Sequence, residues 1–223
     1  MKGINHEDVI GAMGNQGLVP VFSHTDSAIA KKVIDTCYNG GIRVFEFTNR
    51  GKNAVEVFEI LAHHIEQYPD LTLGVGTIFS IKEAERFLDK GVRFIVSPAM
   101  IPELGVFCNE QNIPWIPGCG TVTEVYQATQ LGVDMVKIFP GNVLGPGFVK
   151  SLKAVYPNLQ VMPTGGVEPT KDNLKAWFDA GVTCVGMGSK LFDEEILKSD
   201  DYESLQDIIE ETLSTIEEHR RTS

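Results

Sequence analysis

Met135-Val-Lys-Ile-Phe-Pro140 combines β-branched and aromatic residues with one central lysine and ends in a proline. This composition is typical of a short β-strand that the proline terminates. Because side chains alternate along a strand, Lys137 shares one face with Met135 and Phe139. If both faces are buried, Lys137 projects into an apolar interior, where burial disfavours the ammonium form and favours a neutral, nucleophilic amine. The alternative is a half-exposed strand whose lysine is solvated.

Apolar runs of strand length recur at regular intervals along the whole chain, and helix-like segments separate them. The predicted strands cover residues 18–22, 44–48, 71–76, 94–97, 114–117, 135–139, 160–163 and 184–188. Helices are expected over residues 26–38, 54–68, 81–90, 123–131 and 171–180, with a closing helix over residues 200–217. Glycines before several strands fit helix C-termini, and Ser, Thr or Asp precedes several helices as an N-cap.

This alternation, with strands that are apolar on both faces, predicts a (β/α)8 TIM barrel. An open doubly wound sheet is the alternative. Its Gly-rich dinucleotide fingerprint is missing from the first strand–helix turn, where Phe22-Ser-His-Thr-Asp26 stands instead. No linker and no low-complexity tract interrupts the pattern, so we expect residues 1–223 to form one barrel domain.

The bulk composition argues against two classes of partner. The 223 residues are 43% hydrophobic and 22% charged, as in ordinary globular proteins. A net charge of −11 argues against a nucleic-acid-binding or anionic-membrane surface, which requires clustered lysine and arginine.

Residues 1–8 contain no apolar signal segment, and no run reaches membrane-spanning length. The four cysteines form no C-x-x-C pair, so we expect reduced thiols in a cytoplasmic protein.

Polar groups lie toward the C-terminal ends of the predicted strands, where the chemistry of such barrels takes place. Glu46 stands between Phe45 and Phe47, and a buried carboxylate is unfavourable unless it is paired or used. Glu46 and Lys137 come from the second and sixth strands, on opposite walls of a barrel that side chains just fill, so they can meet directly or through a water. We therefore expect an acid/base and nucleophile pair; the alternative is a structural salt bridge.

A second group of residues follows the seventh and eighth strands, where barrels often build a phosphate site. Pro163-Thr-Gly-Gly-Val167 and Val185-Gly-Met-Gly-Ser189 place glycines there. Glycines let backbone N–H groups approach an anion closely, and Ser189 adds a hydroxyl. Lys190, the next residue, offers a positive charge. Two such turns on adjacent strands predict a phosphate-binding site.

Together these motifs resemble a known family, the class I pyruvate aldolases that split 2-keto-3-deoxy-6-phosphogluconate (KDPG) and 4-hydroxy-2-oxoglutarate (KHG). The resemblance extends from Val19 to Ser189 and keeps the family's motif order. The shared motifs are Phe45-Glu-Phe-Thr-Asn-Arg50, Gly74-Val-Gly-Thr77, Ser97-Pro98, Pro117-Gly-Cys-Gly-Thr121, Val136-Lys-Ile-Phe-Pro140 and Pro163-Thr-Gly-Gly166. Two positions depart from the family, which often has Ala-Glu in place of Gly141-Asn142 and an aromatic residue in place of Lys190. Both departures concern the aldehyde half of the substrate.

The resemblance implies a role for each motif residue. Lys137 would form the Schiff base, and Glu46 would be the general acid/base. The substrate-binding residues implied are Arg50 and Thr77 for the pyruvate carboxylate, Pro98, Phe139 and Thr164 for the pocket lining, and Gly165, Gly166, Gly188 and Ser189 for the phosphate. The resemblance also implies a homotrimer that needs no metal, and we expect no cofactor.

The implied reaction is cleavage of KDPG to pyruvate and glyceraldehyde 3-phosphate, with KHG cleavage to pyruvate and glyoxylate as a further activity. One alternative is the same lysine chemistry on a related sugar acid, such as the 6-phosphogalactonate form. A second is a phosphate-binding barrel enzyme without Schiff-base chemistry, and a third is a catalytically silent metabolite-binding barrel. Histidine-based metal catalysis is not expected, since the adjacent His63 and His64 cannot face one ligand from a helix.

Overall fold

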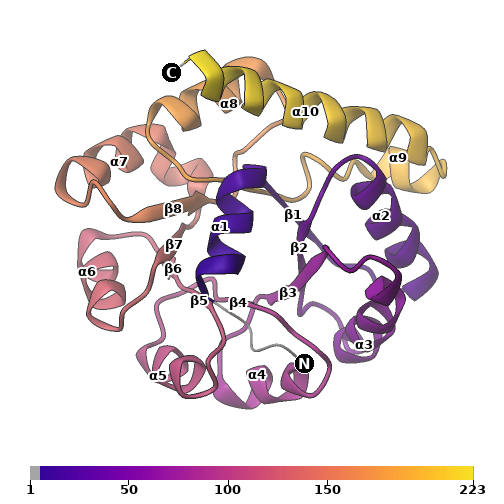
Figure 1. The fold of residues 1–223 in the computed structure, drawn as a ribbon, viewed down its shortest axis with the longest axis horizontal. Coiled ribbons are helices and arrows are strands. Elements are labelled where there is room, and N and C mark those ends of the chain that lie inside the picture. The colour runs from indigo at the N-terminus through magenta and orange to yellow at the C-terminus, as the bar shows by residue number, and fades with distance from the viewer. Residues whose placement is uncertain (1–5, 223) are drawn as a thin grey trace.

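The computed structural model describes residues 6–222, in which parallel strands lie inside a ring of helices (Figure 1). Most of residues 1–8, where we expect no signal segment, lie outside the described part. The strands are β1 (Leu18–Phe22), β2 (Val44–Thr48), β3 (Thr72–Gly76), β4 (Ile95–Val96), β5 (Trp115–Ile116), β6 (Gly118–Cys119), β7 (Met135–Ile138), β8 (Gln160–Pro163) and β9 (Val185–Met187). The bounds of β1, β2 and β8 are those predicted from the sequence.

The strand order supports a curled parallel sheet. Six strands pair in the order β5-β4-β3-β2-β1-β9, and three pair in the order β6-β7-β8. A parallel bridge between Thr164 and Gly186 connects the end of β8 to β9, and Pro117 alone separates β5 from β6. Consecutive strands are therefore neighbours, whereas a doubly wound sheet reverses its order at a switch point.

The helices are α1 (His6–Gln16), α2 (Ser27–Asn39), α3 (Ala54–His64), α4 (Ile81–Leu88), α5 (Pro102–Glu110), α6 (Val122–Gln130), α7 (Gly141–Val155), α8 (Lys171–Asp179), α9 (Glu194–Lys198) and α10 (Tyr202–Thr222), with a 3-10 turn at Ile65–Gln67. Asp26, Ser80 and Thr121 accept hydrogen bonds as N-caps of α2, α4 and α6. These caps explain why the starts of those helices lie within a residue or so of the expected ones.

Some predicted boundaries are wrong, and four helices had no counterpart among those predicted. The helix expected over residues 54–68 ends at His64 and continues as the 3-10 turn. The closing helix extends to Thr222 rather than residue 217. The four are α1, α5, α7 and α9. α7 contains Gly145 in a non-helical conformation followed by Pro146, which breaks helical periodicity, and α9 has only five residues.

Alternation along the strands divides the apolar residues into an outer and an inner core. Outward-facing residues such as Phe45, Phe47 and Val136 pack in the layer between strands and helices. The inner cluster consists of Val9, Ile10 and Met13 of α1 with Val19, Val44, Phe94, Val96, Ile116, Met135, Met162 and Cys184. Val19, Val44 and Met135 of this cluster lie at or next to the first residue of their strands, so α1 covers that end of the interior, as Figure 1 shows.

Hydrogen bonds from the last residue of α1, Gln16, connect this helix to the start of β1 and β2. The Gln16 side chain donates to the Leu18 and Val44 carbonyls and accepts from the Arg43 and Val44 N–H groups. These contacts satisfy backbone groups at the start of β1 and β2, which would otherwise be left without partners. The described chain is thus an α/β protein whose curled parallel sheet is closed off by α1 at one end.

Candidate active site

Glu46 and Lys137 lie inside the curled sheet, above the apolar cluster that α1 covers. Lys137 Nζ is 3.6 Å from Glu46 Oε1, and the two side chains are 6% and 0% exposed. Strand alternation explains both positions. Val44 and Met135 face the interior, and Glu46 and Lys137, two residues further along the same strands, face the same way. The structure therefore brings the two predicted catalytic residues together.

Space for the Glu46 carboxylate comes from glycine on the neighbouring strand. β2 and β3 pair in parallel, with Glu46 opposite Gly74 and Thr48 opposite Gly76. A Cβ atom at Gly76 would lie 1.8 Å from Glu46 Oε1, and one at Gly74 would lie 2.4 Å from the Phe94 ring. Both distances are far below van der Waals contact, so only glycine at these positions leaves room for Glu46 and Phe94.

The Glu46 carboxylate is buried without hydrogen-bond partners. Within the described residues, neither Glu46 oxygen accepts a hydrogen bond, and the buried Thr164 hydroxyl also lacks a partner. Burial raises the pKa of Glu46, while the positive charges of Lys137 and, more weakly, Arg50 oppose that shift. Unsatisfied buried polar atoms are rare, and a catalytic role or a bound water is among the explanations for them.

Backbone pairing with the neighbouring strands holds Lys137 in place, and its side chain lies near an aromatic ring. Its N–H donates to the Pro117 carbonyl at 2.8 Å, and it pairs with Gly118 and Met162 on the neighbouring strands. Its Nζ atom lies 5.5 Å from the centroid of the Phe139 ring. The Lys137 amino group is thus positioned between the Glu46 carboxylate and the Phe139 ring.

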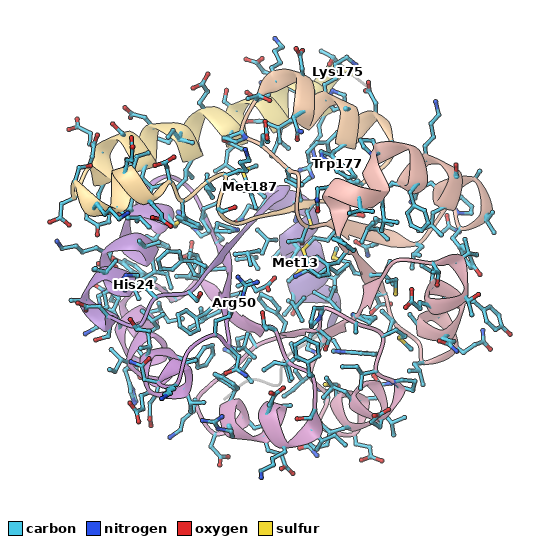
Figure 2. The ribbon with its side chains drawn as sticks, turned by 180° about the vertical axis from the view of Figure 1, so that it is seen from behind. Met13, His24, Arg50, Lys175, Trp177 and Met187 are labelled. Atoms are coloured by element: carbon cyan, nitrogen blue, oxygen red, sulfur yellow. The ribbon has the colours of Figure 1, made fainter. Side chains whose placement is uncertain are left out.

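A pocket of about 210 Å³ opens at the C-terminal ends of β1, β2, β7, β8 and β9. Its walls are Val21, Ser23, Thr48, Arg50, Phe139, Thr164, Gly165, Gly166, Val167, Gly188, Ser189 and Lys190. Neither Glu46 nor Lys137 is one of its walls, but Thr48 and Phe139, which are, each follow one of the pair by two residues along the same strand direction. Figure 2 views the molecule from the face opposite α1 and shows Arg50 near the middle of the ring. The pocket is open to solvent on the side where barrel enzymes carry their chemistry.

Glycine conformations shape one wall of this pocket. Gly165 and Gly166 have φ angles of 90° and 72°, which are unfavourable for other residues. The backbone at Gly166 packs closely on Asn142, since a Cβ atom added to Gly166 would lie 2.8 Å from the Cα atom of Asn142. Asn173 fixes the same turn, because its Nδ2 donates to the Gly166 carbonyl at 3.1 Å and its Oδ1 accepts from Glu168 N–H at 3.0 Å.

The pocket includes seven of the predicted substrate-binding residues, but not Thr77 or Pro98. The seven are Arg50, Phe139, Thr164, Gly165, Gly166, Gly188 and Ser189. Thr77 follows Gly76 and has a φ angle of 63°, a strained conformation for a β-branched residue that is often associated with function. The Pro98 backbone lies against Gly118, where a Cβ would be 2.3 Å from the Pro98 carbonyl carbon. Both residues thus adjoin Glu46 or Lys137 through a glycine.

Sequence reasoning did not name Val21, Ser23, Thr48 and Val167 as parts of the site, and it named Lys190 only as a nearby charge. Thr48 could have been found, because it lies two residues after Glu46 and shares its face. Ser23 follows β1 directly and carried no motif that distinguishes it from a turn residue. Its place in the pocket depends on the pairing of β1 with β2 and β9.

A larger hollow of about 490 Å³ lies at the opposite end, between α1 and α10, and is lined in part by Arg43 and Arg220. Both arginines are engaged in structural contacts. Arg43 Nε is 2.8 Å from Asp70 Oδ2, and Arg220 donates to the Asn15 and Thr183 carbonyls. Size alone is therefore a poor guide to the site, and the buried pair and the glycine turns make the smaller pocket the candidate.

Residues 6–222 contain no group of three or more His, Cys, Asp or Glu side chains arranged to hold a metal ion. None of the helices in this part of the chain combines the length and apolarity needed to cross a membrane.

Comparison with known proteins extends the resemblance seen in the motifs. Residues 9–208 match the family model described as KDPG and KHG aldolase. The chain is 30% identical over 180 residues to the 2-dehydro-3-deoxy-phosphogluconate aldolase of Zymomonas mobilis, covering 80% of this chain and 84% of that protein. It is 35% identical over 130 residues to the 2-dehydro-3-deoxy-6-phosphogalactonate aldolase of Escherichia coli, covering 57% and 62%.

A solved structure shows the same arrangement of the backbone. The crystal structure of the KDPG aldolase from Legionella pneumophila superposes with a TM-score of 0.82 at 27% identity, covering 90% of this chain and 96% of that one. That crystal holds pyruvate captured at low pH as a covalent carbinolamine intermediate.

Proposed function

Because the chain belongs to the KDPG and KHG aldolase family and is therefore a carbon–carbon lyase, we propose that it cleaves KDPG to pyruvate and glyceraldehyde 3-phosphate through a Schiff base on Lys137. The observation that carries this proposal is the buried contact of 3.6 Å between Lys137 Nζ and Glu46 Oε1 beside an open pocket. A nucleophilic amine and a carboxylate within reach of one substrate carbon chain are what the reaction requires.

In the proposed mechanism, neutral Lys137 attacks the C2 ketone and forms a carbinolamine, which loses water to give an iminium ion. Glu46 then accepts the proton of the C4 hydroxyl, directly or through a water. The C3–C4 bond breaks, its electron pair moves into the iminium, and the aldehyde leaves. Glu46 returns the proton to C3 of the resulting enamine, and hydrolysis of the iminium releases pyruvate and regenerates Lys137.

The remaining residues are proposed to bind and orient the substrate. Arg50 suits the keto-acid carboxylate because a guanidinium can bind both oxygens, and Thr77 adds a hydroxyl at the same end. Pro98, Phe139 and Thr164 would line the reacting centre, and Gly165, Gly166, Gly188 and Ser189 would hold the phosphate. Holding both ends of the chain presents C2 to Lys137 and supplies much of the rate enhancement.

We further propose that the two sheets together form one (β/α)8 barrel domain over residues 1–223. The sequential strand order, the Thr164–Gly186 bridge and the single-residue break at Pro117 support closure. A cytoplasmic homotrimer is proposed from the family resemblance alone. Light scattering tests this proposal by measuring the molecular mass in solution, which should be three times that of one chain.

The main alternative keeps the lysine chemistry and changes the sugar acid. The likeness to a 6-phosphogalactonate aldolase supports testing that substrate beside KDPG and KHG. A barrel enzyme that binds phosphate without Schiff-base chemistry would also use the glycine turns. It would have no use for the Lys137–Glu46 pair.

A substrate panel tests the proposal. KDPG, its galactonate-derived isomer and KHG are each supplied to the enzyme, and pyruvate release is followed with lactate dehydrogenase. We expect release from KDPG that is unchanged by a metal chelator and is lost in the Lys137→Arg variant, which keeps a charge but not the nucleophile. No release from any of the three, or equal release by the variant, would overturn the proposal.

A further inference from the structure

We propose that Lys190 determines the specificity of the enzyme for a substrate that carries a phosphate monoester at the end distal to the keto acid, and that Glu168 tunes the strength of that selection. This inference rests on the proposed function, because it concerns the second end of the same substrate. It assigns a role to two residues that lie outside the motifs of the resemblance.

The first observation is the charge distribution of the pocket. Arg50 and Lys190 are the cationic side chains among its described walls, and none of those walls is a carboxylate. Arg50 follows β2, whereas Lys190 follows β9, so the two cations come from different strands of the ring. A pocket with a cation from each of two walls suits a substrate that is anionic at both ends.

The second observation is the ion pair of Lys190 with Glu168. Lys190 Nζ is 3.1 Å from Glu168 Oε1, with the two side chains 58% and 41% exposed. Lys190 directly follows Ser189, and Glu168 lies two residues after Gly166. The pair therefore connects the two glycine turns that form the proposed phosphate site, and Asn173 holds the Glu168 backbone in place.

The chemistry of the ammonium group gives this pair its proposed function. Lys190 has three N–H donors, and Glu168 occupies one side of the group, so donors remain for an incoming phosphate oxygen. The Glu168 carboxylate competes with the phosphate for Lys190. It also repels the phosphate, since the carboxylate and the phosphate are both negatively charged. Removal of Lys190 and removal of the Glu168 charge should therefore change phosphate selection in opposite directions.

A second lysine–carboxylate pair provides a matched control. Lys175 and Asp179 on α8 are 59% and 49% exposed and lie 2.6 Å apart, so their exposure resembles that of Lys190 and Glu168. Figure 2 shows Lys175 on the outer side of the ring, away from Arg50. A Lys175→Met variant makes the same change of net charge as Lys190→Met without touching the pocket.

The test measures discrimination, the ratio of kcat/KM for KDPG to kcat/KM for the unphosphorylated sugar acid. Lys190→Met should lower this ratio about tenfold, the loss expected for one charge-assisted hydrogen bond at a partly exposed site. Glu168→Gln should raise the ratio about threefold, and Lys175→Met should match the wild type. A ratio that Lys190→Met leaves unchanged, or that Lys175→Met lowers equally, overturns the inference.

A binding measurement separates this inference from the proposed function. Glycerol 3-phosphate is titrated into each protein, with glycerol as the uncharged probe, and binding is followed by NMR line shifts. The wild type should bind the phosphate ester, Lys190→Met should bind it about tenfold more weakly, and Glu168→Gln should bind it more tightly. If pyruvate release fails while this pattern holds, only the aldolase proposal is lost. If the three affinities are equal, only the role of Lys190 is lost.

Discussion

The two ends of the interior differ in what they bury. At the N-terminal ends of the strands, Met13 and its neighbours on α1 pack on apolar side chains, and Gln16 satisfies the backbone groups of the first strands. At the C-terminal ends, Glu46 and Lys137 are buried in the same interior, and both Glu46 oxygens lack hydrogen-bond partners. The comparison teaches that one end of this interior is packed like an ordinary core, whereas the other holds the charged pair that we propose for the chemistry.

Electrostatics predicts that the buried Glu46–Lys137 pair contributes little to the free energy of unfolding. Two charges lose hydration when they are buried, and their attraction rarely exceeds that loss unless further hydrogen bonds complete the site. At 3.6 Å the contact is longer than a hydrogen bond. Burial raises the pKa of Glu46 in this pair, and groups with perturbed pKa values cluster at functional sites.

The largest expected effect comes from replacing both charges with apolar groups of similar length, in the Lys137→Met and Glu46→Met double variant. Pyruvate release should fall on the order of 10⁴-fold because nucleophile and base are both removed. The free energy of unfolding should stay the same or rise by up to about 4 kcal/mol, as for other buried ion pairs. Urea unfolding measures this change, and a clear loss of stability would remove the distinction between the two ends.

At the opposite end, Met13→Ala should show the reverse pattern. Met13 is fully buried, so truncation should lower the free energy of unfolding by about 2 to 4 kcal/mol through lost apolar contacts and a cavity. The kcat of the folded fraction should equal that of the wild type at 25 °C. A lower kcat in fully folded Met13→Ala protein would show that the two ends are coupled.

A smaller effect is expected from Gly76→Ala, which tests the geometry of the carboxylate. The new methyl group would meet Glu46 Oε1 at 1.8 Å, so Glu46 must move relative to Lys137. We expect kcat to fall by about 10- to 100-fold, since displacements of about 1 Å have such effects. Gly11→Ala on α1 is the control; nothing lies within 4 Å of its added Cβ, and it should stabilise the helix by about 0.5 to 1 kcal/mol.

The smallest effect concerns pH. Because burial raises the pKa of Glu46, the base form is lost at a higher pH than for an ordinary glutamate, whose pKa is about 4.3. The acid limb of kcat/KM should therefore lie above pH ~4.3 and be absent in the slower Glu46→Gln variant. The same raised pKa affects the free energy of unfolding. Glu46 contributes to stability below pH ~4.3, and this contribution is lost as the pH rises through the pKa that Glu46 has in the folded protein.

Much of this arrangement could be predicted from the sequence because strand alternation is a local property. The positions of Glu46 two residues after Val44, and of Lys137 two residues after Met135, assigned all four to the interior. The structure bears out that the carboxylate and the amine meet. The glycine turns after β8 and β9 were also recognisable, since glycine with positive φ marks a turn that few other residues adopt.

Features that depend on packing between distant segments could not be predicted. The role of α1 as a cover for the interior follows from contacts with the inner strand residues, not from its own sequence. The room that Gly76 leaves for Glu46 depends on the register of β2 and β3. The pairing of Lys190 with Glu168 requires the turns after β8 and β9 to lie side by side, which no local pattern reveals.

The most direct test of a nucleophilic amine in this interior is reductive trapping. The wild-type protein is incubated with pyruvate and sodium borohydride, and the intact mass and the modified peptide are determined by mass spectrometry. We predict one adduct of reduced pyruvate on Lys137, absent in Lys137→Met and still formed in Met13→Ala. An unmodified wild-type protein, or an adduct on another lysine, would contradict the account.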